Sequence, residues 1–190
     1  MDGVSNLGLC VRRLDTDALV GFIEITQIVR GSFSSAYLGY YAFSPHAGQG
    51  FMKDGLQQAV RLAFNRLGLH RLEANIQPEN FASIQLVKAC GFAKEGYSPR
   101  YLKIAGRWRD HERWTILAEE WLAAHDRVRI RDPAECRGHA HLLGEPQPRD
   151  VGVDRDLLLR AGGDDVDPAF ERCLRALETV PGDQIGRAHV

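Results

Sequence analysis

The sequence predicts an α/β protein built on a mixed β-sheet. Three observations lead to this fold class. Residues up to 43 and from 94 to 117 read as strands, two segments between them have helical periodicity, and the resulting order of elements is β-β-β-α-β-α-β-β. A helix between two strands indicates a crossover connection, whereas strands that follow one another directly indicate hairpins.

The first part of the chain reads as three strands. Gly8–Arg13 is short and is followed by a turn-rich Asp-Thr-Asp, after which Leu19–Ile28 alternates so that Ile23 and Ile25 share one face. This pattern predicts a hairpin. Ser35–Phe43, rich in aromatic and small residues, is the third strand.

The central part reads as two helices around one strand. The first helix carries a single apolar stripe and ends near Gly68, and the stripe consists of Met52, Leu56, Ala59, Val60, Ala63 and Leu67. Arg71–Ile76 alternates as a strand. Asn80 is placed to cap a second helix, which Gly91 ends. Lys94–Ile104 and Arg107–Leu117 then flank Ala-Gly, which predicts a closing hairpin.

The composition changes near residue 125, because lysine is absent after Lys103 while Arg, Asp, Gly and Pro dominate. We therefore expect a folded domain over residues 1–124 and a poorly structured, irregular tail over residues 125–190, in which only Pro168–Val180 looks helical. Ile185–Val190 reads I-G-R-A-H-V, as one frame of a common sequencing adapter would encode. The hypothesis is that this end is an assembly artefact, and resequencing the locus tests it.

Charge and composition argue against several classes of partner. Lys and Arg number 24 against 25 Asp and Glu, so the net charge of −1 offers no general attraction to a nucleic acid polymer or an acidic membrane. With neither a long apolar run nor a signal-like start, the expected location is the cytoplasm. The cysteines form no C-x-x-C pair, and the loose Cys136, His139 and His141 group has no clear fourth ligand, so no metal site is expected.

The passage between the third strand and the first helix, Ser44–Met52, predicts an anion site. Gly48 and Gly50 let the backbone come close to a ligand, and a helix start presents unpaired amide N–H groups. Because helix starts also use glycine without binding a ligand, the surrounding sequence must decide.

Those surroundings make residues 8–122 resemble the GNAT acetyltransferase superfamily, and within it the ribosomal-protein alanine N-acetyltransferases. The resemblance rests on A-G-Q-G-F-M, on L-H-R-L-E-A-N at Leu69–Asn75, on P-E-N-F-A-S at Pro78–Ser83, on G-F at Gly91, and on R-Y-L-K-I-A-G-R-W-R-D-H at Arg100–His111. It implies the acyl-CoA N-acyltransferase fold. The chain begins at what corresponds to the second strand of that fold, so the usual first strand and two helices on the acceptor side are expected to be missing.

The resemblance also implies acetyl-CoA as co-substrate and assigns its contacts. Its pantetheine arm would pair with Ser35–Phe43 as a surrogate strand, and its pyrophosphate would lie on successive N–H groups of the glycine turn. The implied cofactor-binding residues are Tyr41, Phe43, Gly48, Gln49, Gly50, Phe51, Met52 and Asn80. Ala47 departs from the family pattern, which has Gln or Arg there, and the loss of that donor should weaken phosphate binding without abolishing it.

For catalysis the resemblance suggests Asn80 and Ser83 near the thiol, with the Ser83 hydroxyl as acid for the thiolate, and Glu73 as base through a water. The structural alternatives are that Asn80 is only a helix cap, Ser83 an inward helix residue, and Glu73 a solvated or Arg71-paired carboxylate. Asp110 and His111 fit a loop-orienting role as well as proton transfer. Trp108 and Tyr101 fit either an acceptor cleft or ordinary packing.

Three functions follow. The first is an enzyme that acetylates a protein N-terminal amine, such as that of a ribosomal protein. Neutralising an α-amine at pH 7 costs only about 1 to 1.4 kcal/mol against roughly 4.6 for lysine, which suits a site with no obvious catalytic dyad. The second is an acetyltransferase for a small amine such as a polyamine, aminoglycoside or amino acid. The third is a non-catalytic fragment that keeps the acetyl-CoA pocket. The residues give no oligomeric state.

Overall fold

The computed structural model describes residues 5–13, 15–44, 46–126, 151–153, 159–160 and 185–188. The described elements are, in chain order, β1 (Leu7–Arg13), β2 (Leu19–Val29), β3 (Ser35–Phe43), α1 (Phe51–Asn65), β4 (Arg71–Ile76), α2 (Phe81–Ala89), β5 (Ala93–Ile104), β6 (Arg107–Leu117), α3 (Ala118–Asp126), β7 (Val151–Val153), β8 (Leu159–Arg160) and β9 (Ile185–Ala188).

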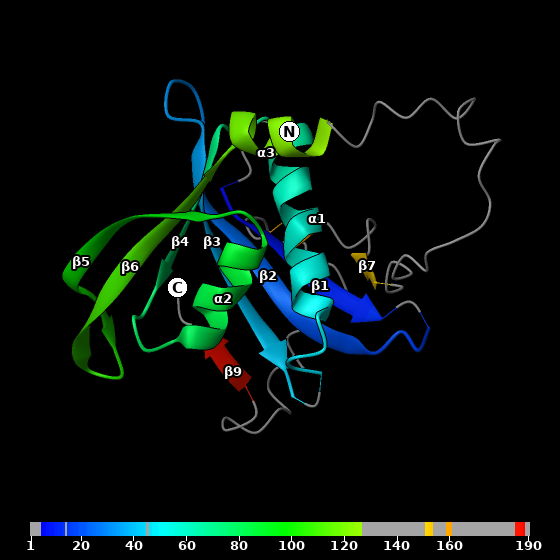
Figure 1. Ribbon diagram of the computed structural model, residues 1–190, viewed down its shortest axis with the longest axis horizontal. Helices are drawn as coiled ribbons and strands as arrows, with labels where there is room; N and C mark the ends of the chain where they lie inside the picture. Colours follow the sequence, from blue (N-terminus) through cyan, green and yellow to red (C-terminus); the bar gives the residue numbers. More distant parts are fainter. Residues whose placement is uncertain are drawn as a thin grey trace, which may run out of the picture.

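These strands form one mixed sheet in the order β5-β6-β4-β3-β2-β1-β7, with β8 beside β1 and β9 beside β3 (Figure 1). The β3–β4 pair is parallel, and the neighbouring pairs β1–β2, β2–β3, β4–β6 and β5–β6 are antiparallel. The predicted mixed sheet, the two hairpins and the two crossover helices are therefore confirmed. The sequence did not predict α3, which runs two residues past the expected boundary at 124, or the short strands β7, β8 and β9. The helix expected at Pro168–Val180 lies outside the described residues.

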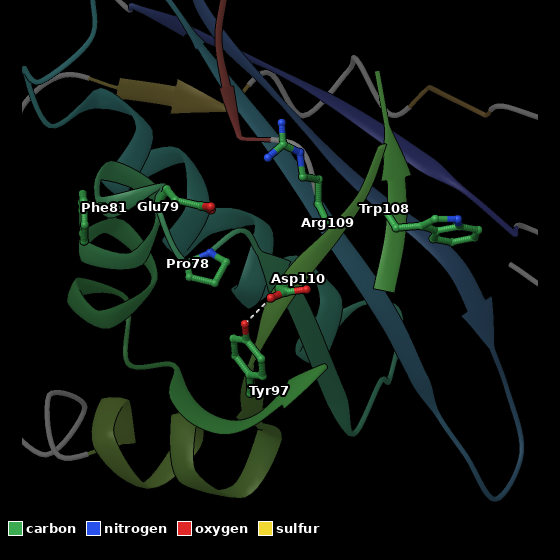
Figure 2. A pocket seen from close by; sticks show the side chains of 7 residues that line it. All are labelled: Pro78, Glu79, Phe81, Tyr97, Trp108, Arg109 and Asp110. Carbon is green, nitrogen blue, oxygen red and sulfur yellow. Dashed lines mark hydrogen bonds between the residues drawn. The ribbon is translucent and has the colours of Figure 1, made fainter. Parts of the chain in front are cut away.

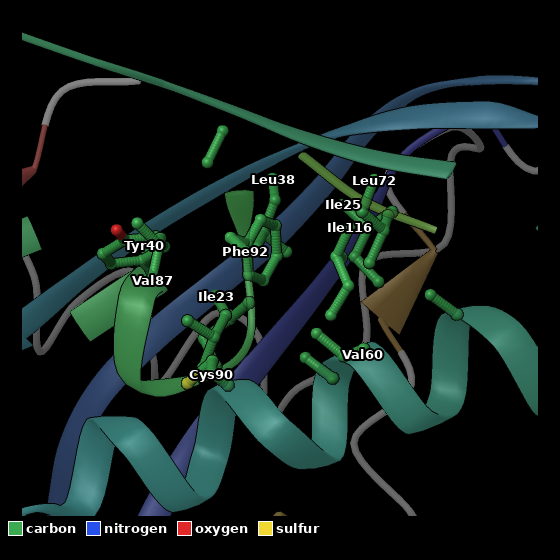
Figure 3. Packing of buried hydrophobic residues seen from close by; sticks show 14 of the residues in the cluster. Ile23, Ile25, Leu38, Tyr40, Val60, Leu72, Val87, Cys90, Phe92 and Ile116 are labelled. Carbon is green, nitrogen blue, oxygen red and sulfur yellow. The ribbon is translucent and has the colours of Figure 1, made fainter. Parts of the chain in front are cut away.

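The hydrophobic core lies between the sheet and the two crossover helices, which cover the same face (Figures 1 and 3). Ile23 and Ile25 of β2 and Leu38 of β3 are fully buried there, opposite the apolar stripe of α1. Gly55 allows α1 to lie close to β1, because a Cβ on Gly55 would lie 2.8 Å from a Val11 methyl carbon. The helical stripe read from the sequence is the buried face of α1.

The opposite face of the sheet carries the alternate residues of the same strands. Since Ile23 and Ile25 point into the core, Glu24 between them points away from the helices, as do Tyr37 and Tyr41 on either side of buried Leu38 and Tyr40. The sheet thus has one packed apolar face and one face with aromatic and ionisable groups. No helix in the described part of the chain is long and apolar enough to cross a bilayer.

Candidate functional site

The centre of the site is the place where β3 and β4 separate. They pair only from Ser35 opposite Arg71 to Tyr37 opposite Glu73, so the rest of β3 has no partner in β4. Part of this edge, Tyr40–Phe43, instead pairs antiparallel with β9 (Figure 1). The edge of β3 beyond Tyr37 is thus one that an extended backbone can join, as the implied pantetheine contact requires.

The glycine turn lies directly beyond the end of β3. Gly48 and Gly50 have positive φ angles of 76° and 88°, and Gly50 caps α1 without any side-chain hydrogen bond. Lys53 and Asp54 both donate their N–H to the Gly50 carbonyl, at 3.0 and 3.2 Å. In the described part of the chain no hydrogen bond uses the N–H groups of Gly50, Phe51 and Met52. These donors, at the positive end of the helix dipole, suit a phosphate.

A cation also lies at this helix start, and sequence reasoning missed it. The Arg13 guanidinium, at the end of β1, lies 5.1 Å from the centroid of the Phe51 ring, the first residue of α1. Asp15 forms an ion pair with Arg13 at 2.5 Å, and the Arg13 hydrogen bond lowers the pKa of the exposed Asp15 carboxyl to about 2. Arg13 is 38 positions before Phe51, so no local motif signals this approach. Ala47 is exposed and carries no side-chain donor, so Arg13, paired with Asp15, is a cationic side chain at the first residue of α1.

The start of α2 brings together two of the three expected catalytic residues. The Asn80 side chain caps α2, and its Oδ1 accepts the Ser83 N–H at 3.1 Å. Ser83 is buried, with 5% of its surface exposed, and its carbonyl accepts the Tyr40 hydroxyl at 3.2 Å. Because Tyr40 belongs to β3, this bond fixes the first turn of α2 against the separated part of β3. The expected capping role of Asn80 is confirmed, and its roles toward cofactor and thiol stay predictions.

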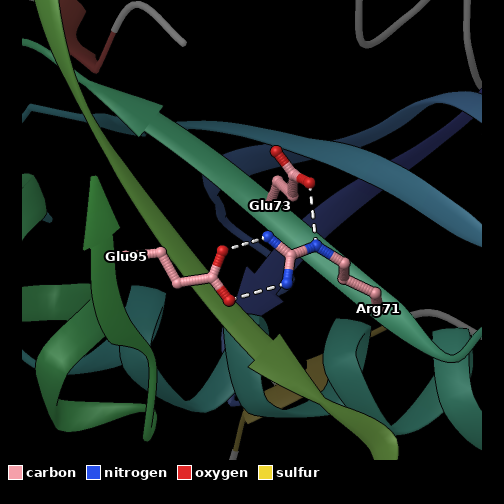
Figure 4. Close-up of polar contacts among 3 residues, drawn as sticks. All are labelled: Arg71, Glu73 and Glu95. Atoms are coloured by element: carbon pink, nitrogen blue, oxygen red, sulfur yellow. Dashed lines mark hydrogen bonds and ion pairs between the residues drawn. The ribbon is translucent and has the colours of Figure 1, made fainter. Parts of the chain in front are cut away.

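Glu73, the expected base, is held in an ion network (Figure 4). Its Oε1 accepts the Arg71 Nε at 2.8 Å, and the same guanidinium binds both oxygens of Glu95. The hydrogen bond from Arg71 lowers the pKa of the Glu95 carboxyl to about 2. The Glu73 side chain is only 13% exposed. The Arg71-paired arrangement is therefore the one that the structure contains, and a catalytic role for Glu73 has to operate from within it.

A pocket of about 330 Å³ opens between the start of α2 and the β5–β6 hairpin, lined by Pro78, Glu79, Phe81, Tyr97, Trp108, Arg109 and Asp110 (Figure 2). Asp110 organises this region, because it accepts the Tyr97 hydroxyl and the Arg100 N–H. The Tyr97 hydrogen bond lowers the pKa of the Asp110 carboxyl. Asp110 thus holds the hairpin, which is one of its two expected roles, and its role in proton transfer stays a prediction.

The structure separates the two aromatic residues expected in the acceptor cleft. Trp108 lines the pocket and points away from Tyr97 in Figure 2, whereas Tyr101 contacts the His111 ring edge-on at 5.7 Å between centroids. Burial and a hydrogen bond with Tyr101 raise the pKa of Tyr37 on β3. Tyr101 therefore lies on the face opposite the helices, next to the last paired residue of β3. His111 is fully buried, and its Nε2 has no partner among the described residues.

The described residues contain no group of three His, Cys, Asp or Glu side chains arranged to hold a metal ion. Cys136, His139 and His141 lie outside the described residues.

A mixed sheet whose parallel strands separate beside an amide-lined helix start is the architecture of the acyl-CoA N-acyltransferases. A model of the acetyltransferase (GNAT) domain family matches residues 2–93. The family resemblance drawn from the motifs is thereby confirmed.

Individual relatives agree on the family and differ in substrate. The chain is 37% identical over 107 residues to the ribosomal protein uS5-alanine N-acetyltransferase of Escherichia coli, covering 56% of this chain and 55% of that protein. It is similar to Mycobacterium smegmatis RimJ in complex with CoA-disulfide, with a TM-score of 0.53, 35% identity and coverage of 58% and 56%. A dodecameric structure of spermidine N-acetyltransferase from Vibrio cholerae gives a TM-score of 0.58 at 27% identity, with coverage of 65% and 70%. The chain spans about half the length of the curated relatives it matches.

Proposed function

We propose that this protein is an acetyl-CoA-dependent N-acetyltransferase that acts on a primary amine. The observation that carries the proposal is the separation of β3 from β4 directly beside a helix start with three N–H groups that lack a partner within the described residues. A strand edge and an amide cluster in line suit one ligand with an amide-containing arm and a phosphate end. The GNAT family match and the similarity to a CoA-bound relative support the same reading.

In this proposal the cofactor is held mainly by backbone groups. The β3 edge around Tyr41 and Phe43 pairs with the amides of the arm, and the phosphates lie on the turn from Gly48 through Gln49 and Gly50 to Phe51 and Met52. The Arg13 guanidinium, which is paired with Asp15, lies at the same helix start. When bound, acetyl-CoA supplies an acetyl group activated as a thioester.

The catalytic groups proposed for this chain come from β4 and α2. Asn80 and Ser83 begin α2, and the bond from Tyr40 to the Ser83 carbonyl holds this turn against β3, which supports the proposed role of the Ser83 hydroxyl as the acid for the departing thiolate. Glu73 ends the paired part of β4 and could receive the amine proton through a water. Its carboxylate is bound to Arg71, so this role has to operate from within that ion pair.

The proposed acceptor is the N-terminal α-amine of a protein, such as a ribosomal protein. The similarity to the uS5-alanine enzyme supports it, as does the low cost of neutralising an α-amine. The second candidate is a small amine, which the similarity to spermidine N-acetyltransferase favours. A protein that binds acetyl-CoA without turnover is the third candidate.

Two measurements separate these candidates. Isothermal titration with acetyl-CoA tests the cofactor site, and a chain that shows no binding would overturn the proposal for all three. Thiol release from acetyl-CoA, followed with alanine-starting peptides and with spermidine at equal concentrations, then ranks the acceptors. A higher kcat/KM for the peptides supports the first candidate, and a higher value for spermidine supports the second. Binding without any thiol release supports the third.

A further inference from the structure

One carboxylate on the face opposite the helices has no assigned role. Glu24 lies in the middle of β2 and is partly buried. Within the described residues, no hydrogen bond or ion pair reaches its carboxylate. A partly buried carboxylate without a partner costs folding free energy, because water solvates it less and no protein donor compensates. Such a group suggests a ligand that supplies the missing positive charge.

The register of the sheet places Glu24 beside the point where β3 separates from β4. Its direct cross-strand neighbour on β3 is Gly39, two residues beyond Tyr37, where pairing with β4 ends. Directly opposed residues in an antiparallel pair have Cα atoms about 4.5 to 5.5 Å apart, with side chains on one face. Because Gly39 has no side chain, β3 does not separate the Glu24 carboxylate from the strand edge at this position.

The direction of the proposed cofactor puts its reacting end near Gly39. The phosphate-binding turn follows the end of β3, so an arm that pairs with β3 runs backward from the turn toward the separation point. The stretch from Gly39 to Phe43 is about 14 Å long at a rise of roughly 3.4 Å per residue. The acyl end would then lie near Gly39, with Glu24 on the neighbouring strand.

The described neighbours of Glu24 on β1, β2 and β3 are uncharged, while Arg71 and Glu73 of β4 lie further along the same face and Arg187 of β9 is the register partner of Tyr41. On the same face stand the Tyr37 and Tyr41 phenols of β3, Phe22 and Thr26 of β2, and Gly8 and Cys10 of β1. Burial, and secondarily the charge of Glu24, raise the pKa of Tyr41 to about 12. Burial also raises the pKa of the Glu24 carboxyl, which makes its carboxylate a better proton acceptor than an exposed one. Glu73 differs, since Arg71 already compensates its charge.

We propose that Glu24 binds the ammonium form of the acceptor amine and takes its proton, which makes Glu24 a catalytic residue of the N-acetyltransferase. This inference rests on the proposed function. The ammonium transfers one proton to a Glu24 oxygen, the neutral nitrogen attacks the thioester carbon, and the C–N bond forms as the C–S bond breaks. The second proton of the nitrogen goes to the departing thiolate, directly or through Ser83. Glu24 releases its proton to water, so that one amide, one free thiol and one proton result.

The test compares Glu24→Gln with Glu73→Gln and with the exposed control Glu119→Gln, whose side chain is 67% exposed on α3. With the acceptor that the wild type uses best, Glu24→Gln should lower kcat/KM about 100-fold or more, raise the KM for the amine, and move the acid limb of the pH profile to higher pH. Its affinity for acetyl-CoA should stay within about twofold of wild type, and Glu24→Asp should recover part of the activity. Glu119→Gln should leave activity unchanged.

The remaining outcomes decide the inference. Because the Gln side chain removes a charge that has no partner within the described residues, thermal unfolding of Glu24→Gln at pH 7 should occur at the same temperature as wild type or higher, so lost activity would not reflect lost folding. Should Glu24→Gln not fold, Glu24→Asp takes its place, with a smaller loss and a shifted pH profile expected. An unchanged kcat/KM and pH profile in the Glu24 variants, or loss of the acid limb in Glu73→Gln alone, would overturn the role of Glu24 and leave the proposed function intact. Failure of wild type to bind acetyl-CoA would overturn both.

Discussion

Replacing Gly50 with valine should separate cofactor binding from folding. Gly50 has a φ of 88°, a conformation that costs an L-residue about 1 to 2 kcal/mol, and valine is β-branched as well. Three N–H groups at this helix start, those of Gly50, Phe51 and Met52, have no partner within the described residues. A hydrogen bond to a charged group contributes about 1.5 to 3 kcal/mol. If the valine side chain removes two such bonds to phosphate, affinity for acetyl-CoA falls by about 3 to 6 kcal/mol, or two to four orders of magnitude.

Isothermal titration with acetyl-CoA measures this loss, and Gly68→Val is the matched control. Gly68 also has a positive φ, 63°, and a Cβ there meets no atom within 4 Å. It lies beyond the other end of α1, so its substitution carries a comparable backbone cost without touching the turn. Both variants should therefore unfold at lower temperature, and only Gly50→Val should lose affinity. A Gly50→Val protein that binds acetyl-CoA within about threefold of wild type would refute the placement of the phosphates.

Three further results are expected. Arg13→Gln should weaken acetyl-CoA binding about tenfold at low salt and less at high salt. Arg61→Gln, at an exposed position in the middle of α1, should leave this affinity unchanged, and an equal loss in both variants would show that Arg13 is not part of the site. The pKa of Glu95 is lowered to about 2, so its bond to Arg71 should add stability above pH 5 that is lost as the pH falls toward 2. Glu95→Gln should flatten this part of a curve of unfolding free energy against pH. The effect should be small because the Glu95 side chain is 39% exposed. A chain ended at residue 184 should bind acetyl-CoA at least as tightly as the full chain, since β9 pairs with the β3 edge that the proposal gives to the cofactor, and weaker binding would make β9 part of the site.

Local sequence signals were sufficient for the elements whose residues interact with near neighbours. The apolar stripe of α1, the glycines before it and the Asn80 cap each depend on contacts a few residues apart, and all three lie where the sequence predicted. The order of elements also restricted the topology, because a helix between two strands requires a crossover.

The rest depends on register and on tertiary contacts. The point where β3 and β4 separate is set by how many residues pair, which no local pattern encodes. The approach of Arg13 to Phe51, and the position of Glu24 opposite Gly39, follow from strand pairing across the sheet. The sequence offered Glu73 as a base or as a solvated or Arg71-paired carboxylate, and the contact of Arg71 with Glu95, 24 residues away, is what no local pattern indicated.

In the proposed enzyme, the separation of β3 from β4 has a consequence for how the acceptor preference can change. Even-numbered residues of β3 such as Leu38 and Tyr40 fill the core, odd-numbered residues such as Tyr37 and Tyr41 face the other side, and the main chain beyond Tyr37 does not pair with β4. Substitutions at the odd-numbered positions therefore alter what approaches that face without opening a cavity under α1 or altering the hydrogen bonds of the edge. A single strand can in this way hold its packing and its cofactor contact constant while its acceptor preference varies.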